Sequence, residues 1–229
     1  MTLWERIAAI LSSAREATLG ALMDAMEKRQ RQRDAAVFSI ALIALSAKMA
    51  KADGVATEDE FAAFLDFFSV PAGEEARVRM VYDLAKADVG GFESYARKVG
   101  KLFGQETSVL EDVLACLFYV AMADGVLHPG ELKLLEVAKD AFGMSDACFR
   151  RVKAAHVGLD DDDPYAVLGL DPGIDTVELK NAYRALVKQH HPDTMLARGV
   201  PQELLSIAEH RMATINAAYE KAIKERQPL

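Results

Sequence analysis

Apolar residues recur along most of this chain at three- and four-residue spacings, which is the period of an amphipathic α-helix. The run from Val37 to Met49 is apolar almost throughout and predicts a helix buried in a core. A second apolar run over residues 113–122 predicts another. Alanine, leucine and glutamate are plentiful, and runs of β-branched residues are short, so the pattern predicts an all-α protein.

The chain also contains an internal repeat. Residues 50–55 read AKADGV and residues 121–126 read AMADGV, and a glutamate follows each aspartate by seven residues, at Glu60 and Glu131. Each copy lies between two apolar helical runs. Two copies of helix, Asp-Gly loop and helix predict a pseudo-symmetric helical domain.

Local chemistry accounts for part of this repeat. Gly54 and Gly125 suit the left-handed position that ends a helix, and Pro129 suits the first turn of the next one. Asp53 and Asp124 are less well explained. An EF-hand is excluded, because its earlier ligand positions carry no side-chain oxygen here. A different divalent-metal site on Asp53 and Asp124 stays open beside simple capping and hydrogen bonding.

The duplicated motif, over residues of about 35 to 150, resembles the TerB domain, a helical module of tellurite-resistance and envelope-stress proteins. The resemblance implies an acidic surface that is a candidate for metal binding. We therefore predict a TerB-like domain over residues 34–155. Residues 1–33 form an N-terminal amphipathic helical segment and basic linker, whose apolar face either packs on the protein or contacts a membrane surface.

An acidic hinge is predicted over residues 156–163, because four consecutive aspartates repel one another and break helical periodicity. Beyond it, Asp175 and Glu178 have capping-box spacing for a helix that Pro192 ends. A loop then leads to Pro201, which suits the start of the last helix. The segment therefore predicts a helical hairpin.

Two groups of candidate binding residues lie on this hairpin. The tripeptide His191-Pro192-Asp193 lies at its tip, and His190 before it is expected to have no role of its own. A basic stripe precedes the tripeptide on the same helix, because its members are spaced by four: Lys180, Arg184 and Lys188.

Residues 164–226 resemble the J domain of DnaJ-type co-chaperones, and we predict a J domain over residues 164–229. The match rests on PYAVLG at residues 164–169, ELKNAYR at 178–184, the tripeptide, and INAAYE at 215–220. The resemblance implies that the basic stripe docks on the ATPase domain of a DnaK-type chaperone, and that the tripeptide then stimulates ATP hydrolysis. One departure is Thr194, where many J domains have a basic residue.

A TerB-like domain followed by a J domain also resembles the DjlA/DjiA group of co-chaperones. Members of that group carry an N-terminal membrane anchor, and this sequence departs from that pattern. We therefore expect a cytoplasmic protein with at most peripheral contact at the inner face of the membrane. The expected partners are a DnaK-type chaperone and a client protein of unknown identity.

Several classes of function are not expected. The net charge of −8 argues against nucleic-acid binding. Phosphate-cradling and Ser/His/Asp motifs are missing, so we predict no enzyme activity and no required cofactor. Cys116 and Cys148 lack metal-ligand spacing and predict free thiols.

The TerB-like domain is expected to act in client selection, localisation or stress sensing. The alternative hypothesis is a metal-binding stress-response scaffold, centred on Asp53 and Asp124, with a secondary or degenerate J domain.

Overall fold

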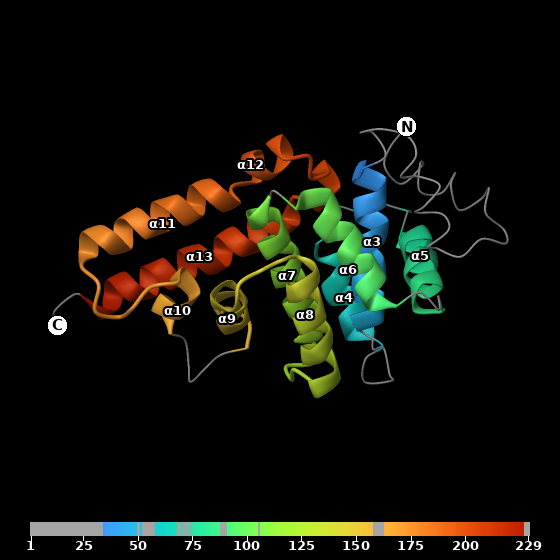
Figure 1. Cartoon of the computed structure of the whole chain (residues 1–229), viewed down its shortest axis with the longest axis horizontal. Coiled ribbons are helices and arrows are strands. Elements are labelled where there is room, and N and C mark those ends of the chain that lie inside the picture. Colours follow the sequence, from blue (N-terminus) through green and yellow to red (C-terminus); the bar gives the residue numbers. More distant parts are fainter. Residues whose placement is uncertain are drawn as a thin grey trace.

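The computed structural model describes residues 34–49, 51, 58–67, 70, 73, 75–87, 91–104, 106–157 and 163–226. Within these ranges every regular element is a helix, which confirms the predicted all-α class (Figure 1). Asp53, Gly54, the N-terminal segment over residues 1–33 and residues 158–162 of the predicted hinge lie outside them.

The helices of the N-terminal domain are α3 (Asp34–Met49), α4 (Glu58–Leu65), α5 (Glu75–Ala87), α6 (Phe92–Phe103), α7 (Thr107–Ala121), α8 (Pro129–Ala141) and α9 (Asp146–Ala154). The C-terminal helices are α10 (Pro164–Leu168), α11 (Thr176–His190), α12 (Pro192–Ala197), a 3-10 turn (Gln202–Leu204) and α13 (Ser206–Glu225).

Helix α3 forms the centre of the N-terminal domain, because it is apolar on all sides and has no face that favours water. It packs against α5, α6 and α7. Phe38 of α3 meets Phe103 of α6 edge to face, with ring centroids 4.8 Å apart. Helix α6 in turn lies against α8 at Gly100, where a Cβ would meet the Ala141 carbonyl oxygen at 2.4 Å. Only glycine permits that approach.

The second copy of the sequence repeat has the predicted geometry only in part, because α7 already ends at Ala121 and Gly125 lies in the loop that follows. Gly125 takes a left-handed φ of 85°, and Pro129 opens α8. The backbone N–H of His128 donates to Glu131 Oε2 at 2.9 Å, which ties the loop to the first turn of α8. The glutamate of the repeat therefore has a capping role in this copy.

The C-terminal hairpin of α11 and α13 has an apolar core of its own, built with α10 (Figure 1). Its side chains include Leu168, Leu179, Leu186, Ile215 and Ala222. Asp175 and Glu178 form the predicted capping box, in which the backbone N–H of Glu178 donates to Asp175 Oδ1 at 2.7 Å. The hairpin is therefore fixed by local capping as well as by burial.

The segment after the tripeptide differs from the prediction. A loop was expected as far as Pro201, whereas the residues from Pro192 onwards form the short helix α12. Pro192 ends α11 and also suits the first turn of α12. A backbone N–H at that position has no acceptor within the helix, so proline gives up no hydrogen bond there. Pro201 precedes the 3-10 turn instead of opening the last helix.

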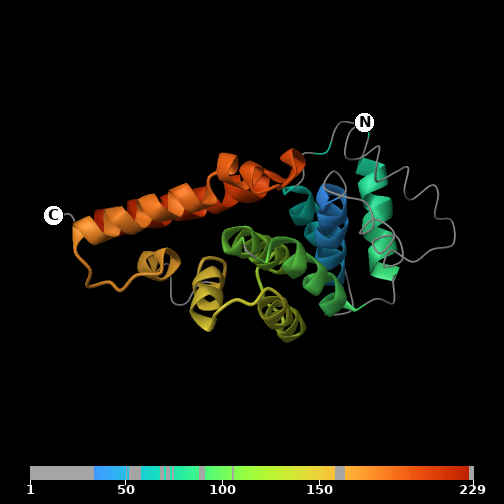
Figure 2. The ribbon, with the colours of Figure 1, turned by 45° about the horizontal axis from the view of Figure 1, so that its top comes forward.

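The hairpin and the N-terminal domain are packed together where the end of α11 and the start of α13 meet α7 (Figures 1 and 2). Hydrophobic residues of both domains belong to one continuous core there. Within the described residues, no helix has the length and apolar character needed to cross a membrane.

Candidate functional site

The tripeptide His191-Pro192-Asp193 lies at the junction of α11 and α12, where His191 separates the two helices and Pro192 and Asp193 open α12. Its polar side chains face solvent, with 49% of His191 and 88% of Asp193 exposed. The backbone N–H of Asp193 donates to His191 Nδ1 at 3.2 Å. In the neutral ring the hydrogen therefore lies on Nε2, where it can be donated to a partner. Asp193 presents its exposed carboxylate beside it.

The basic stripe of Lys180, Arg184 and Lys188 is exposed along α11 and leads to the tripeptide. A shallow depression of about 380 Å³ joins Arg184 and Lys188 to His191 and Asp193. Lys180 lies about two helical turns before Lys188 on α11 and does not line the depression. The structure therefore gathers most of the predicted binding residues on one surface.

Thr194, the departure from many J domains, has a structural role. Its hydroxyl donates to the carbonyl oxygen of Lys188 at 3.0 Å, across the end of α11. The hydroxyl therefore holds the start of α12 against the end of α11.

The prediction that His190 has no role is wrong. Its side chain is completely buried, and Nδ1 donates to Asp112 Oδ1 on α7 at 2.7 Å. His190 Nε2 also lies 3.7 Å from Glu111 Oε2. The sequence did contain a signal for this contact, because Glu111 and Asp112 interrupt an otherwise apolar helix. Buried carboxylates require partners from elsewhere in the fold.

Five charged or titratable side chains form an interdomain charge cluster: Glu111, Asp112, Arg151, His190 and Arg211. Arg151 of α9 pairs with Glu111, and Arg211 Nε of α13 lies 4.0 Å from Asp112 Oδ1. Burial raises the pKa of Asp112, and the charges of His190 and Arg211 oppose that shift. Burial lowers the pKa of Arg211, and Asp112 opposes that shift in turn. Each charge in the cluster therefore depends on a partner on another helix.

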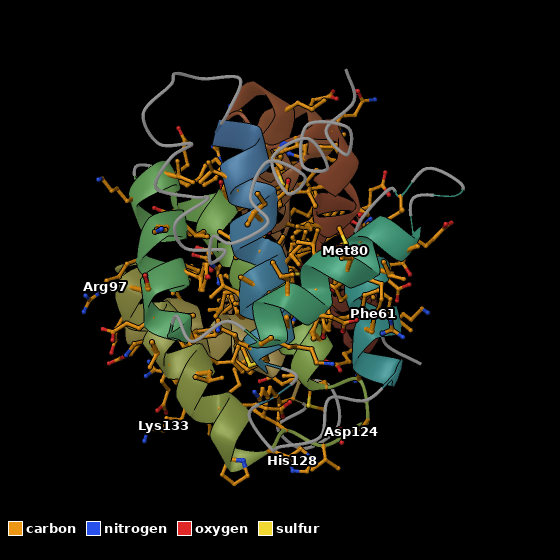
Figure 3. The ribbon with its side chains drawn as sticks, turned by 90° about the vertical axis from the view of Figure 1, so that its right-hand side faces the viewer. Phe61, Met80, Arg97, Asp124, His128 and Lys133 are labelled. Atoms are coloured by element: carbon orange, nitrogen blue, oxygen red, sulfur yellow. The ribbon has the colours of Figure 1, made fainter. Side chains whose placement is uncertain are left out.

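Of the two candidate metal residues, the structure describes only Asp124, since Asp53 lies outside the described residues. Asp124 Oδ1 accepts from the backbone N–H of Val126 at 2.9 Å, and Oδ2 lies 3.1 Å from His128 Nε2 (Figure 3). These hydrogen bonds, the backbone one first, lower the pKa of Asp124. In the part of the chain that the structure describes, no group of three or more His, Cys, Asp or Glu side chains could hold a metal ion.

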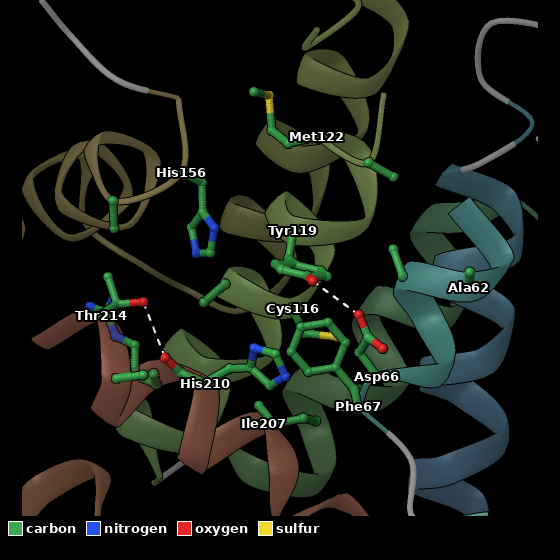
Figure 4. Close-up of a pocket in the computed structure, with 16 residues that line it drawn as sticks. Ala62, Asp66, Phe67, Cys116, Tyr119, Met122, His156, Ile207, His210 and Thr214 are labelled. Carbon is green, nitrogen blue, oxygen red and sulfur yellow. Dashed lines mark hydrogen bonds between the residues drawn. The ribbon is translucent and has the colours of Figure 1, made fainter. Parts of the chain in front are cut away.

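A larger cavity, of about 710 Å³, lies between α4, α7 and α13 (Figure 4). Tyr119 donates to Asp66 Oδ2 at 2.9 Å at its edge, and burial together with this contact raises the pKa of Tyr119. His210 packs against Phe67, with ring centroids 4.8 Å apart. His156 lines another wall (Figure 4). The cavity therefore lies at the boundary between the N-terminal domain and the C-terminal hairpin.

Comparison with known proteins assigns both domains. Residues 39–154 match the family described as Tellurite resistance protein TerB, and residues 163–227 match the DnaJ domain. The chain therefore belongs to the TerB family and carries a DnaJ domain after the TerB domain. This confirms the two resemblances drawn from the repeat and from the hairpin.

Over most of its length the chain is similar to three proteins named Co-chaperone protein DjlA. The protein from Photobacterium profundum is 29% identical over 226 residues, which cover 87% of this chain and 80% of that protein. The protein from Vibrio vulnificus (strain YJ016) is 26% identical, with 86% and 80% covered. The protein from Escherichia coli (strain K12) is 25% identical, with 83% and 80% covered. No solved structure gives a significant match.

Proposed function

We propose that this chain is a J-domain co-chaperone that stimulates ATP hydrolysis by a DnaK-type chaperone and is not itself an enzyme. The observation that carries the proposal is the exposed tripeptide at the end of the basic stripe, on a DnaJ domain. The similarity to proteins named Co-chaperone protein DjlA supports it.

The chemistry of the surface suggests a two-step encounter. The basic stripe attracts an acidic surface of the ATPase domain and orients the approach. His191 then donates through Nε2, and the Asp193 carboxylate accepts a charge-assisted hydrogen bond from an arginine of the partner. Pro192 limits the backbone between them to one shape. Contacts made only with the hydrolysis-competent state of the partner would shift its population toward that state.

Single-turnover ATP hydrolysis by a DnaK-type chaperone tests this function. We expect the wild-type chain to raise the rate and His191→Gln to lose the effect, because glutamine cannot reproduce the ring geometry. The matched control is His128→Gln, which makes the same replacement at a half-buried histidine of the TerB domain. Equal stimulation by wild type and His191→Gln would refute the proposed mechanism.

The basic stripe has a separate test. Replacing Lys180, Arg184 and Lys188 together by glutamine should raise the half-saturating concentration of the chain and weaken its dependence on salt. The rate at saturation should change less, because the tripeptide is untouched. An unchanged half-saturating concentration would remove the stripe from the docking surface.

We propose that the TerB domain acts in client selection, localisation or stress sensing, in the cytoplasm or peripherally at the inner face of the membrane. The function proposed for the J domain needs no cofactor on this chain. A divalent metal on the TerB domain stays a prediction, which calorimetric titration with calcium and other divalent ions would test. A heat of metal binding that is the same for wild type and Asp124→Asn would exclude Asp124 as a metal ligand.

A further inference from the structure

The segment that follows the tripeptide is buried against the TerB domain. Leu196 is 42% exposed, but four other apolar side chains of the segment expose 3% of their surface or less and share a core with α3 and α7: Met195, Val200, Leu204 and Ile207. Arg198, just beyond α12, places Nε 3.0 Å from Oε2 of Glu106, the residue that precedes α7. The downstream flank of the tripeptide is therefore fixed on the TerB domain.

The upstream flank of the tripeptide is fixed on α7, the helix that Glu106 precedes. His190, the last residue of α11, donates from Nδ1 to Asp112 Oδ1 at 2.7 Å, and neither side chain is exposed. Within the described residues, His190 Nε2 and Asp112 Oδ2 make no hydrogen bond. The bond between Nδ1 and Oδ1 is thus the directional contact that sets the orientation of the His190 ring.

The charges around this bond make Asp112 difficult to replace. His190 faces Glu111 and Asp112 of α7, and Arg211 of α13 approaches the same carboxylate. The guanidinium nitrogens of Arg211 have no hydrogen-bond partner among the described residues. If Asp112 is lost, Arg211 and His190 lose the carboxylate between them. Both side chains would then be buried without that partner, and such groups move toward water.

The face that would meet a partner stays open in this arrangement. His191 and Asp193 are exposed, as is the basic stripe, although residues on both sides of the tripeptide are buried. The TerB domain thus holds the two ends of the tripeptide without covering it.

We propose that the TerB domain positions the tripeptide for the DnaK-type partner, with Asp112 acting through His190 on one flank and Glu106 acting through Arg198 on the other. This inference deepens the proposed function and rests on it. It makes Asp112 a positioning residue of the TerB domain, although the tripeptide belongs to the J domain.

The first arm of the test measures single-turnover ATP hydrolysis at increasing concentrations of full-length chain. We expect Asp112→Ala to lower the rate at saturation by about tenfold, since small misplacements of positioned groups cost up to about a hundredfold. The half-saturating concentration should stay within about twofold, because the basic stripe sets the docking. Asp112→Asn keeps an Oδ1 acceptor for His190 and should recover most of the rate. Glu136→Ala, an exposed carboxylate of α8, is the control.

The second arm needs no chaperone. In the isotope-labelled chain alone, the backbone amide resonances of residues 191–194 should shift in Asp112→Ala and stay in place in Glu136→Ala. The imidazole N–H of His190 should be protected from exchange in wild type, because the ring is buried against Asp112. That protection should be lost in Asp112→Ala and kept in Asp112→Asn.

The outcomes separate this inference from the proposed function. If wild type stimulates hydrolysis and Asp112→Ala reaches the same rate at saturation, positioning is refuted and the proposed function stands. If wild type does not stimulate, the proposed function fails, and unshifted amides of residues 191–194 in Asp112→Ala would refute positioning as well. Shifted amides would then support only the structural half of the inference, that Asp112 sets the backbone of residues 191–194.

Circular dichroism establishes whether Asp112→Ala folds. If it does not, Glu106→Ala decides the matter, since Glu106 is partly exposed and its loss buries no unpaired charge. A partly exposed ion pair is worth little, so we expect a loss of about two- to fivefold in the rate at saturation. An unchanged rate in that variant would refute positioning.

Discussion

His156 makes the stability of the fold depend on pH in a way that can be calculated. Its ring lies parallel to that of Phe118, with centroids 6.0 Å apart, and its Nε2 has no hydrogen-bond partner among the described residues. Burial lowers the pKa of His156 to about 3, and the charges of Arg211 and His210 act in the same direction. The ordinary value of 6.5 applies in the unfolded chain.

The direction of the effect follows from proton binding. Between pH 6.5 and about 3 the unfolded chain holds a proton on His156 and the folded chain does not. The free energy of unfolding therefore rises with pH in this window and falls as the solution is acidified. At pH 5 the solution is about 1.5 units below the unfolded pKa, and at about 1.4 kcal/mol per unit the loss is about 2 kcal/mol.

Urea unfolding followed by circular dichroism at pH 7, 6 and 5 measures this loss. The perturbation is His156→Phe, which keeps a ring against Phe118 and removes the titration. Wild type should lose about 2 kcal/mol more than this variant between pH 7 and pH 5. His191→Gln is the control, because it removes an exposed imidazole and leaves His156 in place. Equal losses in wild type and His156→Phe would refute the reasoning, since the pH dependence would then come from other groups.

Two further substitutions test the packing and capping described above by the same unfolding assay. Gly100→Ala should lower the free energy of unfolding by about 1–3 kcal/mol, because its Cβ would lie 2.4 Å from the Ala141 carbonyl oxygen. Gly173→Ala, where the added Cβ meets nothing within 4 Å beyond its chain neighbours, should have little effect, and a Gly100→Ala protein as stable as wild type would contradict the close approach. Asp175→Ala should cost about 1 kcal/mol, because the backbone N–H of Glu178 loses its acceptor; an unchanged midpoint would show that the capping box adds nothing.

The parts of the fold that sequence predicted well are those that local chemistry determines. The apolar run from Val37 predicts α3, because a helix without a polar face has to be buried. Asp175 with Glu178 predicts the start of α11, and Pro192 predicts its end. Each signal acts within a few residues and can be read without knowing what lies across the molecule.

The contacts between domains could not be predicted in this way. His190 ends the basic helix beside the tripeptide and has no local feature that distinguishes it from an exposed histidine. Its partner Asp112 lies 78 residues earlier in the sequence, in a helix predicted only as apolar. Helix α12 was missed for a related reason, because the burial of its Met195 comes from the core shared with the TerB domain and not from its own periodicity. Local patterns predict which elements form, but they do not predict which face of one domain meets the other.

The acidic pair within α7 shows how such a contact could be recognised earlier. Glu111 and Asp112 follow an apolar turn and precede a longer apolar run, so a helix buried on all sides would place both carboxylates in a core. Ionised carboxylates are stable there only beside cations or hydrogen-bond donors. The neighbouring segments of the TerB domain supply Arg151 for Glu111, but Asp112 receives His190 and Arg211 from the J domain. An acidic residue with no partner inside its own domain thus indicates the surface on which the next domain docks, and here that surface holds the residue next to the tripeptide.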